Sequence, residues 1–173
     1  MNGWQTIRTE RLYLREIRED DAEIIVSWRS DPQVYQYFKN PHRITIEEHL
    51  NWYREAYREQ GNMIYWICYF GSAPVGVFGI KKLSKNSAEV SYLIDPKYQH
   101  CGYAREVLDV ILRQAEKKWN ITSVTADVHV NNMASVKFIK AMGFMEDKTD
   151  GFFITYCKKI KTGGRSSNES DNW

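Results

Sequence analysis

The sequence has 173 residues, which at about 150 residues per domain corresponds to one domain. It carries 24 Lys and Arg residues against 22 Asp and Glu residues, so the formal net charge is +2, and this near-neutral balance argues against a nucleic-acid-binding protein. Hydrophobic residues make up 43% and charged residues 27% of the chain, a composition that excludes an intrinsically disordered protein.

The sequence contains no pattern typical of a membrane span, a secretion signal or a metal site. The longest unbroken apolar run, residues 63–70, is shorter than the ~20 residues that a membrane span needs, and the first residues lack an apolar signal stretch. Cys68, Cys101 and Cys157 form no C-x-x-C pair, which indicates a reducing compartment and predicts a cytoplasmic protein. Without an H-E-x-x-H motif or a Cys/His cluster, we expect no metal site.

The first third of the chain predicts one strand and two helices. Leucines alternate with charged residues in residues 9–17, as in a strand with one solvent-exposed face. Residues 20–29 predict a helix with Asp20 as its N-cap. Thr45 with Glu48 three residues later is a capping-box pattern, which predicts a helix that extends to about residue 60.

The rest of the chain predicts hairpins and strand–helix–strand units. The predicted strands are residues 63–70, 73–83, 88–95, 122–130, 144–149 and 152–160, and the predicted helices are residues 103–119 and 133–142. This mixture indicates an α+β fold, with a mixed sheet of seven strands flanked by about four helices. We expect residues 1–160 to form a single domain and residues 161–173, rich in Gly, Ser and Asn, to form a flexible tail.

The most informative segment joins the strand at 88–95 to the helix at 103–119. It places Gln99, Gly102 and Ala104 in the pattern Q-x-x-G-x-A. The first turn of a helix presents free backbone N–H groups and the positive end of the helix dipole. Because Gly102 lets a ligand approach the backbone, the segment predicts a pyrophosphate-binding loop. An ordinary loop that leads into a helix is the alternative.

Two segments of the sequence resemble motifs of one enzyme family. Residues 92–105, YLIDPKYQHCGYAR, resemble motif A of the GCN5-related N-acetyltransferase (GNAT) family. Residues 131–144, NNMASVKFIKAMGF, resemble its second motif, with an Asn, a Ser three residues later and a Gly-Phe pair. The resemblance extends over residues 6–160. It implies the GNAT fold and the transfer of an acetyl group from acetyl-CoA directly to a primary amine.

Different parts of the chain resemble different branches of this family. Residues 9–17 and 92–105 resemble the ribosomal-protein N-terminal acetyltransferases, whereas residues 28–34 and 44–53 resemble acetyltransferases of nucleotide-linked amino sugars, as in pseudaminic acid synthesis. We expect a nucleotide-linked amino sugar or a similar small amine as the acceptor, with a ribosomal-protein N-terminus as the alternative. A catalytically silent acyl-CoA-binding module is the alternative from another functional class. We further expect a monomer or homodimer without a nucleic-acid or membrane partner.

The resemblance also implies where acetyl-CoA binds. In the family, the cofactor lies in a V-shaped opening between the strands that correspond to residues 88–95 and 122–130. The strand residues that would pair with its pantetheine arm are Tyr92, Leu93 and Ile94. The residues that match the pyrophosphate-binding stretch are His100, Cys101, Gly102, Tyr103, Ala104 and Arg105. Asn132 matches an Asn that contacts the cofactor near its sulfur.

The resemblance implies a role for the hydroxyl of Ser135, but this chain lacks a Tyr hydroxyl that many relatives use. Ser135 matches a Ser proposed, in the ribosomal-protein branch, to attend the leaving thiolate. Many relatives carry a Tyr as general acid seven residues after the Asn, where this chain has Ile139. Ser135 or a water would therefore have to take the place of the general acid. A thiol pKa of ~8.5 makes CoA a leaving group that needs little help.

The catalytic base would be a carboxylate, because the acceptor ammonium must lose a proton before it attacks. Thr125, Asp127 and His129 share one face of their strand, and Asp127 lies five residues before Asn132, where some relatives carry a Glu base. Asp127 is the first candidate and Glu89 the second. A solvated or ion-paired structural carboxylate is the alternative for each.

The segment at residues 35–57 is rich in aromatic residues. These are Tyr35, Tyr37, Phe38, Trp52, Tyr53 and Tyr57. In the family the corresponding helices form the wall of the acceptor pocket, and both sugar rings and nucleobases stack on aromatic rings; packing in the core is the alternative. We expect Trp52 or Tyr53 to face the acceptor.

Overall fold

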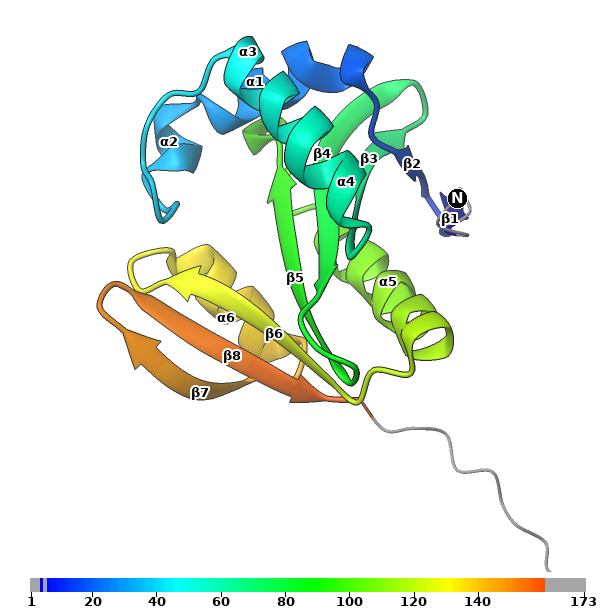
Figure 1. The fold of residues 1–173 in the computed structure, drawn as a ribbon. Helices are drawn as coiled ribbons and strands as arrows, with labels where there is room; N and C mark the ends of the chain where they lie inside the picture. Colours follow the sequence, from blue (N-terminus) through cyan, green and yellow to red (C-terminus); the bar gives the residue numbers. More distant parts are fainter. Residues whose placement is uncertain (1–3, 5, 161–173) are drawn as a thin grey trace, which may run out of the picture.

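Eight strands form one mixed sheet in the order β1-β2-β3-β4-β5-β6-β8-β7 (Figure 1). The computed structural model describes residue 4 and residues 6–160, so the tail expected at 161–173 lies outside the described residues. All neighbouring strands are antiparallel except β5 and β6, which are parallel. The strands are β1 (Ile7–Arg8), β2 (Leu12–Glu16), β3 (Met63–Phe70), β4 (Ala73–Lys82), β5 (Ser87–Ile94), β6 (Ser123–His129), β7 (Met145–Asp150) and β8 (Phe153–Lys159).

The sheet contains one strand more than the seven that the sequence predicts. The additional strand is β1, which pairs Ile7 with Leu14 and Arg8 with Tyr13. A strand of two residues is too short to show an alternation pattern. The remaining strands confirm the mixed sheet and its hairpins, including the β3–β4 hairpin, whose turn contains Gly71 at a φ of 58°.

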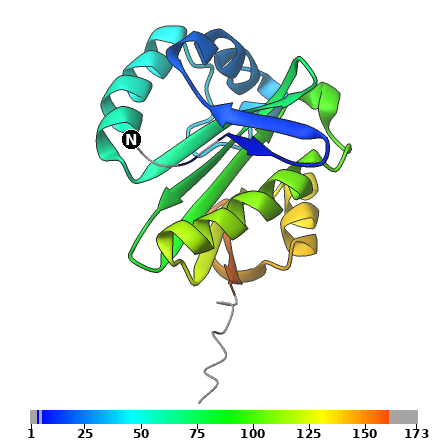
Figure 2. The same ribbon diagram turned by 90° about the vertical axis from the view of Figure 1, so that its right-hand side faces the viewer.

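Helices cover both faces of the sheet (Figure 1, Figure 2). They are α1 (Ala22–Arg29), α2 (Pro32–Tyr35), α3 (Ile46–Asn51), α4 (Arg58–Gln60), α5 (Tyr103–Trp119) and α6 (Met133–Ala141), with two 3-10 turns, η1 (Glu19–Asp21) and η3 (Pro96–Tyr98), and a π-helical segment, η2 (Trp52–Tyr57). The long helices α5 and α6 pack on one face, and the N-terminal helices pack on the other.

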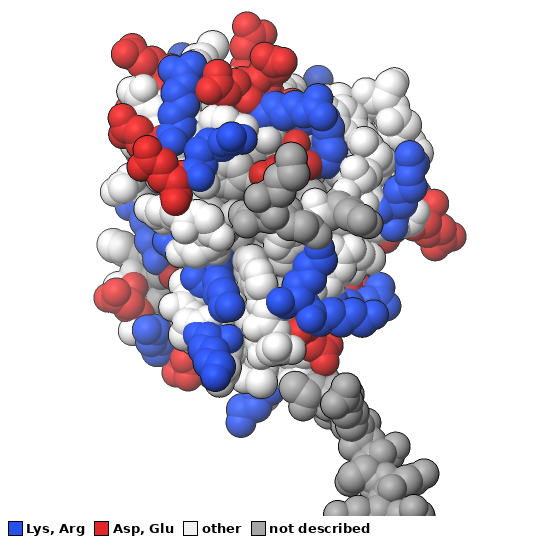
Figure 3. Space-filling view, turned by 45° about the vertical axis from the view of Figure 1, so that its right-hand side comes forward, with Lys and Arg blue, Asp and Glu red and all other residues white. Residues whose placement is uncertain are grey.

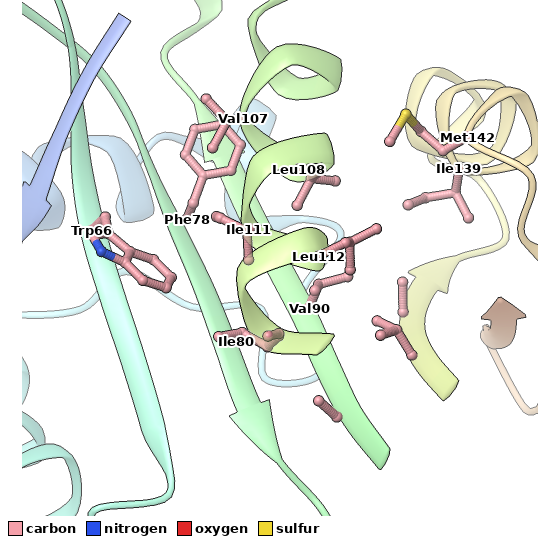
Figure 4. Close-up of a cluster of buried hydrophobic side chains, with 14 of the residues drawn as sticks. Trp66, Phe78, Ile80, Val90, Val107, Leu108, Ile111, Leu112, Ile139 and Met142 are labelled. Carbon is pink, nitrogen blue, oxygen red and sulfur yellow. The ribbon is translucent and has the colours of Figure 1, made fainter. Parts of the chain in front are cut away.

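The main core lies between the sheet and α5 (Figure 4). The apolar stripe of α5 packs against even-numbered residues of β4, β5 and β6, which point to this face. Ile139 of α6, at the position where many relatives carry a Tyr, is 0% exposed and completes this core together with Met142. Burying one such side chain stabilises the fold by about 1.5–3 kcal/mol. The residue at this position therefore contributes to the core.

The helix expected at residues 45–60 is interrupted by a π-helical turn. Its capping box is present: the Glu48 N–H donates to Thr45 Oγ1 at 3.1 Å, and the Thr45 N–H donates to Glu48 Oε2 at 2.6 Å. Farther along, the Arg58 N–H donates to the Tyr53 carbonyl five residues earlier. This wider turn stacks Trp52 on Tyr57, with ring centroids 5.7 Å apart, and forms an aromatic layer over β3.

Within residues 4 and 6–160, no helix has both the length and the apolar composition needed to cross a membrane. The face of the molecule seen in Figure 3 carries Asp and Glu side chains interspersed among Lys and Arg, which agrees with the near-neutral net charge.

Candidate functional site

The parallel strands β5 and β6 pair at one end only and then separate. Their register comprises Ser87 with Ser123, Ala88 with Val124 and Glu89 with Thr125. Beyond this point, residues 90–94 of β5 and 126–129 of β6 have no partner across the gap among the described strands, although each strand still pairs on its outer side. The result is the V-shaped opening that the family resemblance implies between these strands.

The loop after β5 leads into the N-terminus of α5 with its backbone turned toward solvent. Gly102 is the N-cap residue, has a φ of 79° and makes no side-chain cap bond, and His100 has a φ of 61°. A Cβ at Gly102 would meet only Arg11 Nη2, at 3.4 Å. His100, Cys101 and Gly102 are exposed. The loop that leads into the first turn of α5 is therefore open to a ligand, as an anion-binding loop requires.

Two side chains in the predicted pyrophosphate stretch are used for structure. The Tyr103 ring is buried and stacks on Phe70, with ring centroids 5.6 Å apart. Arg105 donates through Nη2 to the Ala141 carbonyl at 3.2 Å and so ties α5 to the end of α6. What this stretch offers a ligand is its backbone, together with the small side chain of Ala104.

Arg11 braces the loop from the β2 side, a contact that the sequence analysis did not identify. Its Nη1 donates to the Cys101 carbonyl at 3.0 Å, and its Nη2 lies 2.8 Å from Glu106 Oε2. Burial acts to raise the pKa of Glu106, but hydrogen bonds from Thr9 and Arg11 outweigh it and hold that pKa below its usual value. Arg11 thus neutralises a carboxylate in the first turn of α5 that would otherwise repel an anion.

A pair of hydroxyls links the two sides of the opening on the α5 and α6 face. Asn132 is the N-cap of α6, and its Oδ1 accepts from the Ser135 N–H at 3.2 Å. The Ser135 hydroxyl lies 3.0 Å from the Tyr92 hydroxyl. Burial raises the pKa of Tyr92 to about 12, although the contact with Ser135 works against the rise. The structure thus joins the side chain of Tyr92, expected to act through its backbone, to the predicted Ser135.

The two candidate bases lie on the opposite face of the sheet, in different environments. Asp127 accepts from Lys39 Nζ at 2.5 Å and from Thr155 Oγ1 at 2.6 Å. Burial acts to raise the pKa of Asp127, but the two hydrogen bonds and the charge of Lys39 outweigh it, so the pKa is lowered. Glu89 is half-buried, and burial, followed by the charge of Asp127, raises its pKa.

The N-terminal helices form an aromatic wall beside Glu89. Trp52 is half-buried and lies edge-on to Tyr65, with ring centroids 5.4 Å apart. Tyr53 is only 7% exposed, and its hydroxyl donates to the Ile17 carbonyl at 3.4 Å. Of the two rings expected to face the acceptor, Tyr53 is thus held in the core by this environment. Trp52 and Tyr65 are partly accessible, as are Tyr35, Tyr37 and Phe38 of the aromatic segment at residues 35–57.

The Tyr65 ring crosses β4 toward Ser91 of β5 because β4 has a glycine beneath the ring. A Cβ at Gly79 would lie 2.2 Å from Tyr65 Cε1, so any side chain there would displace the ring. The charges of Glu89 and Arg29 both act on the Tyr65 phenol, whose pKa is raised mainly by burial. Glu89 and Arg29 therefore lie around one ring on this face of the sheet.

Comparison with known families agrees with this geometry. The model of a family described as an acetyltransferase (GNAT) domain matches residues 11–145. This chain belongs to the GNAT acetyltransferases. It is an acyltransferase that uses acetyl-CoA as its cosubstrate, as the sequence predicts.

Several curated relatives resemble this GNAT chain over most of its length. It is 27% identical over 148 residues to protein MJ1062 of Methanocaldococcus jannaschii, in a match that covers 80% of this chain and 29% of that protein. It is 26% identical over 147 residues to YoaA of Bacillus subtilis, named an uncharacterized N-acetyltransferase, covering 82% and 83% of the two chains. It is 22% identical over 144 residues to the acetyltransferase PseH of Campylobacter jejuni, covering 83% and 89%. The chain thus spans less than a third of MJ1062 and most of the other two.

Solved structures with the same fold act on unlike acceptors. A spermidine N-acetyltransferase from Vibrio cholerae, in complex with CoA and spermine, has a TM-score of 0.74 at 18% identity and covers 87% of this chain and 95% of its own. FdhC, a nucleotide-linked sugar GNAT, has a TM-score of 0.76 at 18% identity with 90% of both chains covered. The ribosomal-protein acetyltransferase RimL has a TM-score of 0.76 at 16% identity, covering 90% and 98%. These likenesses show the fold and leave the acceptor open.

Proposed function

We propose that this N-acetyltransferase acts on a small acceptor that carries both a primary amine and an anionic group, and that a nucleotide-linked amino sugar is the preferred class. The observation that carries the proposal is the state of Arg29, the last residue of α1. Its guanidinium is half-buried, and no hydrogen bond or ion pair of that side chain is found within the described part of the chain. Its contact is the face of Phe38, 5.3 Å from the guanidinium carbon to the ring centre.

A partly buried cation without a counter-ion is costly, because it loses hydration that nothing replaces. Burial accordingly lowers the pKa of Arg29. A phosphate or carboxylate of the acceptor would satisfy the guanidinium through two parallel hydrogen bonds. Phosphate and carboxylate share this chemistry, and FdhC, a nucleotide-linked sugar GNAT among the similar structures, favours the phosphate of a nucleotide.

His49 supplies a second unpartnered polar group beside Arg29. It is 3% exposed, and in the described structure neither ring nitrogen has a hydrogen-bond partner. Burial, followed by the charge of Arg29, lowers the pKa of His49, so the imidazole is neutral at neutral pH. Its ring lies 5.5 Å from that of Trp52, within the aromatic wall. A neutral imidazole can donate one hydrogen bond and accept another, so a rearrangement that exposes the buried ring nitrogens would let His49 bind polar groups of such an acceptor.

We assign the general base to Glu89. Its position at the last paired residue of β5 and its raised pKa suit proton abstraction from an ammonium group, directly or through one water. Asp127 was the first candidate by sequence, but both of its oxygens already accept hydrogen bonds and its pKa is lowered, which makes it the weaker base. In this assignment, Asp127 has a structural role, because it binds Lys39 of the loop after α2 and Thr155 of β8.

The two faces of the opening then have separate tasks. Glu89 would take one proton from the ammonium group and release it to solvent, and the neutral amine would then attack the thioester carbonyl from the Glu89 face. As the carbon–sulfur bond breaks toward the face of Ser135, the electron pair would leave with the CoA sulfur, and the second nitrogen proton would pass to Glu89. A hydrogen bond from Ser135 stabilises the thiolate, which at a pKa of ~8.5 needs no proton transfer to depart. Asn132 and the loop at residues 99–105 would hold the cofactor that supplies this thioester.

The experiment that tests the acceptor class compares Arg29→Gln with Arg29→Lys. The substrates are a UDP-linked 4-amino sugar and the same amino sugar without its nucleotide, assayed by thiol release. Hydrogen bonds to charged groups contribute about 1.5–3 kcal/mol, so Arg29→Gln should raise the KM of the UDP sugar by roughly 10- to 150-fold. The KM of the free sugar should change little, and Arg29→Lys should keep part of the effect. Equal changes for both sugars would refute the proposal.

Two further expectations from the sequence belong to this proposal. The absence of any C-x-x-C pair among the cysteines supports a cytoplasmic location. The near-neutral charge supports a protein that acts on acetyl-CoA and a small amine rather than on nucleic acid or a membrane, and a monomer or homodimer stays our expectation.

A further inference from the structure

The loop between α2 and α3 crosses to the far side of the opening. Lys39 Nζ lies 2.5 Å from Asp127 Oδ2 of β6 and 5.6 Å from the ring centre of Phe153 on β8. The Tyr37 ring lies 5.7 Å from that of His129, also on β6. Figure 1 shows the end of α2 and the loop after it beside the end of β6. The Lys39 ammonium group thus links the loop between α2 and α3 to the C-terminal half of the sheet.

The ion pair between Lys39 and Asp127 reduces the number of carboxylates that are free to bind the acceptor. Asp127 is neutralised by Lys39 and also accepts from Thr155. Glu89 makes no ion pair or side-chain hydrogen bond within the described residues. The charged and titratable groups that act on Glu89 are Asp127 from β6, Lys39 from the loop, Lys81 from β4 and Tyr65 from β3. Of the two candidate bases, Glu89 is therefore the one left unpaired for an incoming ammonium group, while the charge of Asp150 on β7 also acts on Lys39.

We propose that Lys39 is a specificity-determining residue, which occupies Asp127 so that the acceptor site takes one ammonium group and rejects polycationic amines. The inference rests on the proposed function, because it places the acceptor on this face of the sheet. Spermidine carries several ammonium groups and would need more than one carboxylate. It would also be repelled by the positive charge of Lys39.

Lys39 also sets the charge that Glu89 experiences. With Lys39 present, the charges of Lys39 and Lys81 oppose the effect of burial and of Asp127 on the pKa of Glu89. Without Lys39, the charge of Asp127 is no longer compensated, and the pKa of Glu89 rises further. A residue that merely held the loop in place would not shift this titration.

The first experiment measures spermidine binding to CoA-saturated protein by calorimetry. Lys39→Met removes the charge and keeps a stem that can lie on Phe153, whereas Lys39→Arg keeps the charge. Lys117→Met is the matched control, because Lys117 is an exposed lysine of α5 on the opposite face of the sheet. We expect spermidine to bind Lys39→Met at least tenfold more tightly than the wild type, Lys39→Arg or Lys117→Met. Equal affinities in all four proteins would overturn the proposal.

The second experiment follows kcat/KM for the UDP-linked 4-amino sugar as a function of pH. Lys39→Met should move the acid limb of the profile to higher pH, and Lys39→Arg should restore the wild-type position. An unmoved limb in folded Lys39→Met protein would contradict the electrostatic role. If the wild type turns over no amino sugar, the proposed acceptor is wrong, and the spermidine affinities still decide the role of Lys39. Lys39→Gln replaces Lys39→Met if the latter does not fold.

Discussion

The hydroxyl of Tyr92 lies 3.0 Å from the hydroxyl of Ser135, which joins β5 to α6 across the opening of the sheet. Tyr92 thus brings a phenol to Ser135, whereas the position at which many relatives carry a Tyr is the fully buried Ile139. With a pKa of about 12, Tyr92 does not give its proton to a thiolate. By donating to Ser135, it would leave the Ser135 proton free to bond the departing sulfur.

Tyr92→Phe should therefore lower kcat by about 2- to 12-fold, the equivalent of one hydrogen bond of about 0.5–1.5 kcal/mol. The KM of acetyl-CoA should remain nearly constant. In a Ser135→Ala background the same change should have almost no further effect, because both variants break one contact. Tyr69 on β3 is the control: its hydroxyl accepts a hydrogen bond from Arg15 of β2, and Tyr69→Phe should not alter kcat. Additive losses from Tyr92→Phe and Ser135→Ala would show that the two hydroxyls act separately.

Glu89 and Asp127 should have opposite effects on stability. Because the pKa of Glu89 is raised in the folded protein, its stabilising contribution is complete below the unfolded pKa and is lost as pH rises through the folded pKa. Glu89→Gln should thus melt at the same temperature as the wild type or higher at neutral pH. At the same time its kcat should fall by roughly 10²–10⁴-fold if Glu89 is the base.

Asp127 has a lowered pKa, so it stabilises the fold above its unfolded pKa and loses this effect as pH falls through the folded pKa. Asp127→Asn should melt at a lower temperature than the wild type near pH 7, and the difference should vanish in acid. Melting curves and pH–rate profiles of both variants measure these effects. A large loss of kcat in Asp127→Asn with little loss in Glu89→Gln would exchange their roles.

Gly102→Glu should abolish measurable acetyl-CoA binding in a protein that still folds. The site offers a bare backbone at a positive φ, and a carboxylate there would oppose the cofactor pyrophosphate by bulk and charge. Gly102→Ala is the control for the backbone strain, which costs about 1–2 kcal/mol, and it should retain binding. Calorimetry gives the affinity, and acetyl-CoA at a hundred times its Kd should stabilise the wild type by about 2.7 kcal/mol. Unchanged binding in folded Gly102→Glu would mean that the loop is not the pyrophosphate site.

Gly79→Ala should destabilise the protein by about 1–3 kcal/mol, as overpacked sites do, and raise the KM of the acceptor. The added Cβ would lie 2.2 Å from Tyr65 Cε1, so the ring must leave its place over β4. Adding Tyr65→Leu should recover much of the stability, because the obstruction is then removed. Chemical denaturation measures both variants. A stable Gly79→Ala protein with an unchanged acceptor KM would contradict the placement of this ring in the acceptor wall.

Local patterns predict most of this fold and the loop that precedes α5. The alternation in β2, the capping box at Thr45 and the strand–loop–helix around Gly102 depend on residues close in sequence, so they can be identified without a structure. Strand β1 and the π-helical turn at Trp52–Tyr57 are the exceptions. The first is too short for a pattern, and the second arises from packing against β3 rather than from propensity.

The chemistry of the candidate site is harder to predict, because it depends on contacts between distant residues. The sequence identifies Asp127 and Glu89 as carboxylates on exposed strand faces, but it does not show that Lys39, 88 residues away, pairs with Asp127. It likewise does not show that Arg29 lacks a counter-ion or that Tyr92 meets Ser135. These contacts favour Glu89 over Asp127 as the base, which reverses the order given by the sequence.

The most direct test of the account is a competition between a UDP-linked 4-amino sugar and a short peptide with a free N-terminus. Both are incubated with the protein and acetyl-CoA, and mass spectrometry counts acetylated product against CoA released. We predict one acetylated amino sugar for each CoA, with little acetylated peptide. Acetylation of the peptide alone would support a protein N-terminal acetyltransferase instead, and acetyl-CoA binding without turnover of any amine would contradict a catalytic role.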